Sequence, residues 1–241
     1  MLKAKNDMME NNREPGDLRI YPKIYHPRYY YLRQLRKAIE TIIVKHVQGK
    51  KYQKLIDYGC GNVPYKQFFE KHVVEYIGAD LGVNTNAKIQ LKPEGQIPLE
   101  NESVDLVLST QVLEHVDNPH LYLTEAARVL KADGRLIITT HGYWMYHPDP
   151  QDFWRWTSAG LKKIITEAGF EVVDFTGVIG RSAMGLQLFQ DGLMFKLPKF
   201  LRPLLYLKMQ LWIMVFDKIS SQTSRNSDAC TFIVVAKPTK K

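Results

Sequence analysis

Short apolar runs alternate with amphipathic segments along most of this chain. The runs are rich in Val, Ile and Leu, which is typical of buried strands in a parallel sheet. The segments between them carry apolar residues at helical spacing, most clearly over 28–48, where Gly49 then ends the helix. The pattern predicts strands at 55–57, 73–79, 87–91, 104–109, 135–140, 170–175 and 230–236, and helices at 28–48, after Pro64, at 121–130 and at 158–168.

A glycine turn follows the first predicted strand. Asp57 closes that strand, Gly59 and Gly61 come next, and the second strand ends at Asp80. Bare glycines let a ligand approach the backbone, and an acid at the end of the second strand can accept hydrogen bonds from both hydroxyls of a ribose. The order strand, glycine turn, helix, strand, acid therefore predicts a nucleotide-binding βαβ unit.

The details of this turn distinguish between classes of nucleotide. A dinucleotide fingerprint that starts at Gly59 needs a third glycine at the position of Pro64, and a phosphate-binding P-loop needs a Gly-Lys-Ser/Thr ending that 54–81 lacks. The run Asp57-Tyr58-Gly59-Cys60-Gly61 instead resembles the first motif of class I S-adenosylmethionine-dependent methyltransferases. The third glycine common in that family falls at Val63.

Three later passages resemble the same family. Residues 97–109 are similar to its Leu-Pro-Phe and Phe-Asp-x-Val signature, 110–116 to its loop after the fourth strand, and 127–136 to its entry into the fifth strand. The resemblance covers 53–175. It implies an α/β fold with a Rossmann-like, doubly wound, seven-stranded sheet, mostly parallel with one antiparallel strand and with helices on both faces.

The resemblance also implies S-adenosylmethionine as the cofactor. Open parallel sheets bind ligands at the carboxyl ends of their strands, and the motif residues map to that edge. The adenine is expected near Ile97 with Leu81 on its other side, and the ribose at Asp80. The residues expected to bind the cofactor are Asp57, Gly59, Cys60, Gly61, Asp80, Leu81, Ile97, Gln111 and Val112.

An unusually aromatic and titratable loop follows the fifth strand. Residues 141–157 resemble a His-Pro-x-Pro-x-Asp passage of methyltransferase-like proteins associated with bacterial surface-polysaccharide and other secondary biosynthesis. Histidine is the natural base near neutral pH, so His147 or His141 is expected to be the general base, with Asp152 as its orienter. Arg155 is expected to clamp a carboxylate or phosphate of the acceptor.

Structural roles stand beside these assignments. His141 can simply end a strand, and Asp152 can cap a turn and form a salt bridge with Arg155. No metal-ligand spacing is evident, because His141 and His147 lie in one loop and no Cys or third His completes a set, so no metal is expected. The residues expected to contact the acceptor are His115, Tyr143, Trp154 and Arg155.

Composition limits the binding partners and the cellular compartment that can be expected for the protein. The 241 residues fit one α/β domain, and a formal net charge of +8 is compatible with an acidic substrate, a membrane surface or nucleic acid. The two cysteines favour a reducing compartment, with Cys60 as a small residue that fills the turn. The first twenty residues contain no apolar core of a signal peptide, so a cytoplasmic location is expected, either free or peripheral at the inner membrane face.

Two segments lie outside the family pattern. Residues 1–27 are polar and then Tyr-rich, and they are expected either to pack on the domain or to form a flap over the active site. The domain of 28–241 carries an apolar and basic insertion at 185–220, whose uninterrupted apolar stretches are too short to cross a bilayer. Within it, 186–219 is expected to be a lid, a dimer contact or a segment that lies on a membrane surface.

The sequence therefore predicts a methyltransferase that acts on a small-molecule or glycan-linked acceptor, with oxygen as the expected methylated atom. An anionic acceptor is one form of this prediction. One rival is an RNA or other nucleic-acid methyltransferase. It is weakened because no appended RNA-binding module is visible and Asn118-Pro119-His120 is not the Asn/Asp-Pro-Pro-Tyr motif of amino-group methylation. A second rival is a non-catalytic protein that keeps the fold.

Overall fold

A single mixed sheet forms the centre of the molecule. The computed structural model describes residues 16–148 and 151–239, so the expectations for 1–15 lie outside the described residues. The strand order is β3-β2-β1-β4-β5-β7-β6, and β7 runs antiparallel to both of its neighbours. This confirms the predicted Rossmann-like sheet with one antiparallel strand. The strands are β1 Tyr52–Tyr58, β2 Val73–Asp80, β3 Ile89–Gln90, β4 Val104–Thr110, β5 Leu130–His141, β6 Phe170–Gly180 and β7 Ala229–Pro238.

The observed strands differ in length from their predicted ranges, most clearly in β1, β3, β5 and β6. Strand β1 begins earlier, at Tyr52, which pairs with Val73. Strand β3 is shorter, because only Ile89 and Gln90 pair with β2. Strand β5 already begins at Leu130, since Leu130 pairs with Val104 before the register shifts. Strand β6 continues to Gly180, which pairs with Ala229 of β7. The apolar runs indicated where these strands lie, while the partner strands determine where they end.

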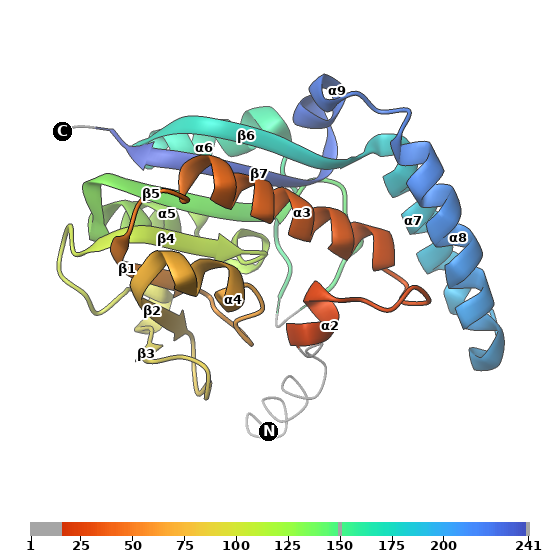
Figure 1. The fold of residues 1–241 in the computed structure, drawn as a ribbon, viewed down its shortest axis with the longest axis horizontal. Helices are drawn as coiled ribbons and strands as arrows, with labels where there is room; N and C mark the ends of the chain where they lie inside the picture. The colour runs from red at the N-terminus through yellow and green to blue at the C-terminus, as the bar shows by residue number, and fades with distance from the viewer. Residues whose placement is uncertain (1–15, 149–150, 240–241) are drawn as a thin grey trace.

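Helices cover both faces of the sheet (Figure 1). Leu55 and Leu106 face the cluster that packs on α3 and α4, whereas Ile56 and Val107 face the cluster that packs on α5 and α6. Neighbouring strand residues alternate between the two clusters, as expected for a sheet buried on both sides. The helices are α2 Gly16–Ile20, α3 Tyr29–His46, α4 Lys66–Phe69, α5 Pro119–Val129, α6 Ser158–Glu167, α7 Arg181–Met194, α8 Arg202–Asp217 and α9 Gln222–Ser227.

The insertion folds into a helical hairpin, α7 and α8, that projects beyond the end of the sheet beside the start of α3 (Figure 1). Its inner face carries buried amides. The carbonyl oxygen of Pro27 accepts from Nε2 of Gln187 (3.1 Å), Gln190 (2.7 Å) and Gln210 (2.8 Å). Gln210 Oε1 in turn accepts from the backbone N–H of Tyr30 at 2.8 Å. The hairpin therefore holds the first turn of α3.

Candidate active site

The glycine turn packs directly against the loop that follows β4. Gly59 has φ +79°, and a Cβ added there would lie 2.7 Å from both methyl carbons of Val112. The N–H groups of Gly59 and Cys60 donate to the carbonyl oxygen of Ala79 at 2.9 and 3.0 Å. Glycine is thus required for its backbone conformation and for the missing side chain. Cys60 is buried in the turn, in keeping with a space-filling role.

Asp80 closes the same edge from the end of β2. Its Oδ2 accepts from the Gly61 N–H (3.1 Å) and from Asn84 Nδ2 (2.6 Å), and its Oδ1 accepts from the Leu81 N–H (2.9 Å). Asn84 Nδ2 also donates to the carbonyl oxygen of Gly61 at 2.7 Å. Asn84 therefore holds the glycine turn and the acid in one arrangement. Sequence reasoning missed this residue, and only its place four residues after Asp80 could have drawn attention to it.

Asp57 is a buried acid with one unsatisfied oxygen. Its Oδ2 accepts from the Tyr76 hydroxyl, while Oδ1 has no hydrogen-bond donor among the described residues. Burial raises the pKa of Asp57 to about 7, against a lowering by the Tyr76 hydrogen bond. A buried carboxylate oxygen beside a glycine turn fits a ligand that brings its own positive charge. The α-ammonium of S-adenosylmethionine is such a group.

The expected adenine contacts differ in exposure. Leu81 is 60 % exposed, whereas the Ile97 side chain is only 1 % exposed and faces the core. The Ile97 N–H donates to Glu125 Oε1 (2.7 Å), and its carbonyl oxygen accepts from Arg128 (2.9 Å). The loop at Ile97 is therefore held firmly, but its side chain faces away from solvent. Contact between Ile97 and the adenine remains a prediction.

Gln111 connects the edge of the sheet to helix α3. It adopts a left-handed conformation (φ +56°), which is uncommon for a residue other than glycine and is found disproportionately at functional sites. Its N–H donates to the Thr139 carbonyl oxygen at 2.9 Å. Its Oε1 accepts from the Tyr31 hydroxyl at 3.0 Å, and that hydroxyl also lies 3.1 Å from Thr231 Oγ1. The start of α3 thus reaches the edge where the cofactor residues gather.

His141 is covered, which does not favour its expected role as a base. The imidazole is 3 % exposed and stacks on Trp144 with ring centroids 4.6 Å apart. Its Nε2 lies 3.3 Å from Glu114 Oε1. Burial lowers the pKa of His141 well below its usual value, and the same effect raises the pKa of Glu114. The covered imidazole therefore contacts Trp144 and Glu114, and its role as a base stays a prediction.

Glu114 is a second residue that sequence reasoning missed. It is fully buried, and its Oε2 accepts from Thr140 Oγ1 at 2.8 Å. Its Oε1 lies beside His141 without hydrogen-bond geometry. The available signal was its position in the passage 110–116, which resembles the family loop. Sequence reasoning selected only its neighbour His115 there.

His147 lies in the loop that follows β5 and precedes α6, which we call the acceptor loop after its predicted role, and it is partly exposed. Its ring meets His141 and His115 edge-on, with centroids 5.1 and 5.0 Å apart. Its Nδ1 lies 3.2 Å from the Met145 carbonyl oxygen and 3.3 Å from Asp152 Oδ2. These two acceptors favour the proton on Nδ1 over the longer contact with the Arg155 N–H donor at 3.5 Å, and this tautomer leaves a lone pair on Nε2. Burial lowers the pKa of His147 to about 4, against the opposing effect of Asp152, so the ring is neutral at pH 7.

Arg155 is committed to its own loop, which does not favour its expected role as an anion clamp. Its NH1 and NH2 donate to the two oxygens of Asp152 at 2.6 and 2.5 Å. Its remaining donors contact the carbonyl oxygens of Trp144, Met145 and Trp154 at 3.1, 2.6 and 2.7 Å. These partners occupy the whole fork, and the salt bridge with Asp152 is the structural alternative that the sequence had left open.

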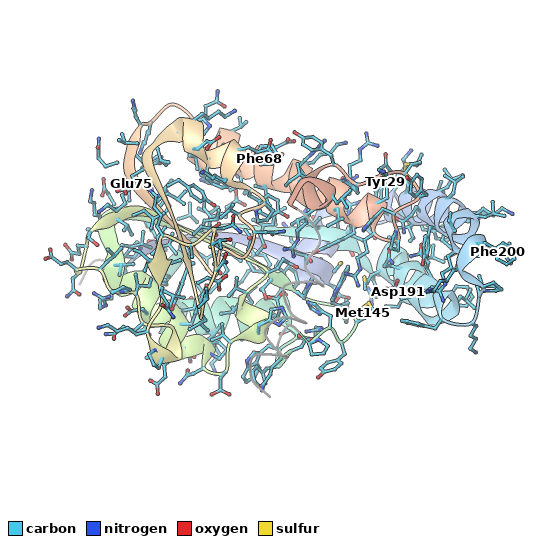
Figure 2. All side chains as sticks on the ribbon, turned by 90° about the horizontal axis from the view of Figure 1, so that it is seen from below. Tyr29, Phe68, Glu75, Met145, Asp191 and Phe200 are labelled. Carbon is cyan, nitrogen blue, oxygen red and sulfur yellow. The ribbon has the colours of Figure 1, made fainter. Side chains whose placement is uncertain are left out.

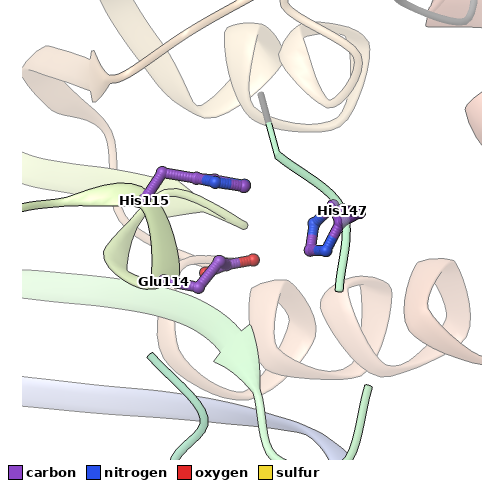
Figure 3. A group of neighbouring side chains, drawn as sticks. All are labelled: Glu114, His115 and His147. Carbon is purple, nitrogen blue, oxygen red and sulfur yellow. The ribbon is translucent and has the colours of Figure 1, made fainter. Parts of the chain in front are cut away.

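Of the other residues expected to contact the acceptor, His115 lies beside His147, whereas the Tyr143 hydroxyl is hydrogen-bonded to Asp228. His115 Nδ1 is 2.5 Å from the Gln151 carbonyl oxygen, and Trp154 Nε1 donates to the Val116 carbonyl oxygen at 2.8 Å. Tyr143 and Trp154 are both exposed. Ligand atoms of Glu114, His115 and His147 lie within 4.8 Å of one another (Figure 3). The sequence did not predict this grouping, since its members come from two loops far apart in the chain.

Comparison with known proteins identifies the family. Residues 28–174, more than half of the chain, match the model of a methyltransferase domain. The chain belongs to the class I S-adenosylmethionine-dependent methyltransferase family. S-adenosylmethionine is therefore its cofactor, and the turn at Gly59, the carboxylate of Asp80 and the unsatisfied oxygen of Asp57 fit that molecule.

The curated relatives match only part of their own length. The methyltransferase domain is 32% identical over 89 residues to a probable S-adenosylmethionine-dependent methyltransferase of Mycolicibacterium smegmatis, covering 34% of this chain and 35% of the relative. It is 25% identical over 123 residues to a ubiquinone biosynthesis O-methyltransferase of Photobacterium profundum, covering 45% of this chain and 52% of the relative. The chain thus spans between a third and about half of the length of these relatives.

Solved structures support the fold. A 1,6-didemethyltoxoflavin-N1-methyltransferase of Burkholderia thailandensis, with 1,6-didemethyltoxoflavin and S-adenosylhomocysteine bound, superposes with a TM-score of 0.55 at 16% identity over 86% of this chain and 79% of that one. The [4+2]-cyclase SpnF superposes with a TM-score of 0.57 at 15% identity over 87% and 84%. At such identities the likeness concerns the fold alone.

Proposed function

We propose that this methyltransferase moves a methyl group from S-adenosylmethionine to an oxygen of a small-molecule or glycan-linked acceptor. The observation that carries the proposal is the meeting of two groups of residues at one edge of the sheet. The glycine turn with Asp57 and Asp80 supplies the cofactor side, and the His147 loop supplies the acceptor side. The oxygen acceptor is supported by the neutral imidazole at His147 and by similarity to an O-methyltransferase.

On the cofactor side, each proposed role follows from a group that is present. Asp80 accepts from the ribose hydroxyls, since Asn84 and Gly61 hold its carboxylate in place. Asp57 accepts from the α-ammonium through its unsatisfied Oδ1. Gly59, Cys60, Gly61, Leu81, Ile97, Gln111 and Val112 complete the proposed cofactor site.

On the acceptor side, His147 is the proposed general base. Methyl transfer from a sulfonium is an in-line displacement, so the protein mainly aligns the two molecules and removes the hydroxyl proton. The Nε2 lone pair of His147 can accept that proton, and Asp152 orients the ring through Nδ1. His141, beneath Trp144, packs edge-on against His147. Tyr143, Trp154 and His115 form the proposed rim of the acceptor site.

Calorimetric titration with S-adenosylhomocysteine tests the cofactor side. Wild type and the matched control Asp133→Ala, at an exposed acid on β5, are expected to bind, and Asp80→Ala is expected to lose at least tenfold in affinity. Turnover is then followed with labelled S-adenosylmethionine and a panel of sugar nucleotides, lipid-linked glycans and phenols. His147→Gln should lose transfer while keeping cofactor affinity. Absence of binding by the wild type would remove the enzyme proposal, and binding without transfer to any acceptor would favour the non-catalytic rival.

We further propose that the α7–α8 hairpin lies on an anionic membrane surface, which suits a lipid-linked acceptor. No helix within 16–148 or 151–239 is long and apolar enough to span a bilayer. The outer side of the hairpin is nevertheless apolar, with Phe200 80 % exposed at the end of the molecule opposite Glu75 (Figure 2). No acid occurs between 192 and 216, whereas Lys196, Lys199, Arg202 and Lys208 do. Apolar side chains flanked by cations match the chemistry of an anionic interface.

Co-sedimentation with vesicles tests this surface. Wild type should pellet with vesicles rich in phosphatidylglycerol and stay in the supernatant with phosphatidylcholine alone. The double variant Phe200→Ser with Trp212→Ser should stay in the supernatant. The matched double variant Val44→Ser with Val83→Ser, at exposed valines outside the hairpin, should still pellet. Recovery of the wild type in the supernatant with both vesicles would overturn the proposal, and a dimer in sedimentation velocity would then support the dimer contact.

A further inference from the structure

The acceptor loops bring three potential metal ligands together. Glu114 and His115 follow β4, and His147 follows β5, yet one ligand atom from each lies within 4.8 Å of the others. Figure 3 shows the carboxylate of Glu114 and the two imidazoles around one common space. We propose that this cluster binds a divalent first-row transition ion, with Zn²⁺ as the best fit.

The hydrogen bonds of the two histidines leave one ring nitrogen of each open. His115 Nδ1 lies 2.5 Å from the carbonyl oxygen of Gln151, which can only accept, so Nδ1 carries the proton. His147 Nδ1 faces two acceptors, the Met145 carbonyl oxygen at 3.2 Å and Asp152 Oδ2 at 3.3 Å, which outweigh the Arg155 N–H donor at 3.5 Å. Metal-binding histidines commonly donate their second N–H to a carbonyl or carboxylate in this way. Both Nε2 atoms therefore present lone pairs.

Glu114 supplies the charge. It is fully buried, Thr140 occupies its Oε2, and its Oε1 lacks a hydrogen-bond donor among the described residues. A buried carboxylate oxygen without a donor is costly unless a cation faces it. A bound divalent ion would supply that partner.

The ligand set selects the class of ion. Two imidazoles and one carboxylate form the set of zinc sites that keep an open position, and of non-haem iron sites, whereas Mg²⁺ and Ca²⁺ prefer oxygen ligands. Tetrahedral zinc, with bonds of about 2.0–2.1 Å, separates its ligand atoms by about 3.3 Å. The partly exposed rings of His115 and His147 therefore move inward on binding.

This role rests on the proposed methyl transfer, but the ion would replace His147 as the general base, because the Nε2 lone pair that accepts the proton in that proposal would bind the ion instead. The acceptor hydroxyl would coordinate at the open position and lose its proton to solvent, because a bound cation lowers the pKa of its ligand. The oxygen lone pair then forms the C–O bond, and the electron pair of the broken C–S bond returns to sulfur, which becomes a thioether. The ion itself is unchanged.

Co²⁺ absorption provides a readout independent of turnover. Tag-free, chelator-treated full-length protein is titrated with Co²⁺ and then with competing Zn²⁺. One Co²⁺ per chain, with the strong visible bands of tetrahedral coordination and displacement by Zn²⁺, is expected for the wild type. His115→Gln and His147→Gln should each weaken affinity at least tenfold. His120→Gln, at an exposed histidine on α5, is the matched control and should bind as the wild type does.

The control measurements separate folding, cofactor binding and metal binding. Circular dichroism establishes that each variant is folded, which matters most for Glu114→Gln because that site is buried. Titration of the same samples with S-adenosylhomocysteine tests the proposed function separately. Absence of Co²⁺ binding by a wild type that binds S-adenosylhomocysteine would overturn the metal site and leave the methyltransferase intact. Binding that His115→Gln and His147→Gln leave unchanged would also overturn it.

Discussion

The hydroxyl of Tyr31 lies 3.0 Å from Oε1 of Gln111, so the first turn of α3 is bonded to a strained residue at the edge of the cofactor site. The Tyr31 ring also packs on Trp144, with centroids 4.4 Å apart. One side chain from the first turn of α3 therefore contacts both the cofactor side and the proposed acceptor side.

Tyr31→Phe tests this connection. Removal of a buried hydroxyl bonded to Gln111 and Thr231 should cost about 1–3 kcal/mol of unfolding free energy, because those partners lose a bond within the core. Affinity for S-adenosylhomocysteine should fall as Gln111 is released. Urea unfolding and calorimetry measure the two effects, with the exposed Tyr21→Phe as the control. A Tyr31→Phe protein as stable as that control would contradict the argument.

Gly59→Ala should be more damaging than an ordinary glycine replacement. Gly49 and Gly59 both have left-handed φ, but a methyl group at Gly59 would lie 2.7 Å from Val112, whereas one at Gly49 would enter open space. Gly49→Ala should cost about 1–2 kcal/mol for the backbone conformation alone. Gly59→Ala should cost a further 1–3 kcal/mol, roughly, for the collision. Thermal unfolding of both variants checks this, and adding Val112→Ala should recover part of the difference.

Cofactor affinity should depend on pH through Asp57. Its pKa is about 7 in the folded protein against 3.8 in the free side chain, and the cationic cofactor favours the ionised form. Affinity for S-adenosylmethionine should therefore rise as pH increases from about 5.5 to 7, by at most roughly tenfold per unit, and level off above. Calorimetry across this range should show no such rise for Asp57→Asn. The exposed Asp133→Asn should behave as the wild type.

The pH dependence of folding stability through Asp57 should be opposite to that of cofactor affinity. Because the folded-state pKa of Asp57 is raised, the folded protein binds more protons than the unfolded chain between about pH 4 and 7. The contribution of Asp57 to unfolding free energy therefore falls as pH rises through that window. Asp57→Asn should remove this contribution, so its stability relative to the wild type should improve from pH 5 to pH 8. Urea unfolding at the two values measures it, and an unchanged difference would refute the assignment.

Arg155→Lys should loosen the acceptor loop without affecting cofactor binding. The guanidinium makes a two-point contact with the buried Asp152 carboxylate, which an ammonium cannot reproduce. Loss of a charge-assisted hydrogen bond in this partly exposed pair should cost about 1.5–3 kcal/mol. If Arg155 holds Asp152 in place, the variant should have a lower melting temperature and a lower rate of methyl transfer to every acceptor, charged or neutral. A loss confined to anionic acceptors would restore the role of anion clamp.

Much of the fold and half of the candidate site could be predicted from the sequence. The turn at Gly59 and Gly61 and the acid at Asp80 belong to one local βαβ unit, so spacing alone places them together. Alternation of apolar runs was sufficient for the strands and for the helix at 28–48. Such features depend on neighbours in the chain, which the sequence displays directly.

The acceptor side could not be predicted to the same depth. The burial of His141 depends on Trp144 stacking over it, and the pairing of Glu114 depends on the register between β4 and β5. The engagement of Arg155 with three carbonyl oxygens requires the loop conformation itself. Periodicity carries no information on such contacts, because each residue is polar and each lies at the end of a strand or in a connection after one.

The Pro27 carbonyl oxygen connects the hairpin to the start of α3. Three glutamine amides from α7 and α8 converge on this single atom, and α3 begins two residues later with Tyr30 and Tyr31 close behind. The hairpin and the first turn of α3 are therefore joined by hydrogen bonds into one unit that ends at Gln111. Under the proposed membrane contact, the binding of the hairpin to a bilayer would be linked to the geometry of the cofactor site through one backbone oxygen.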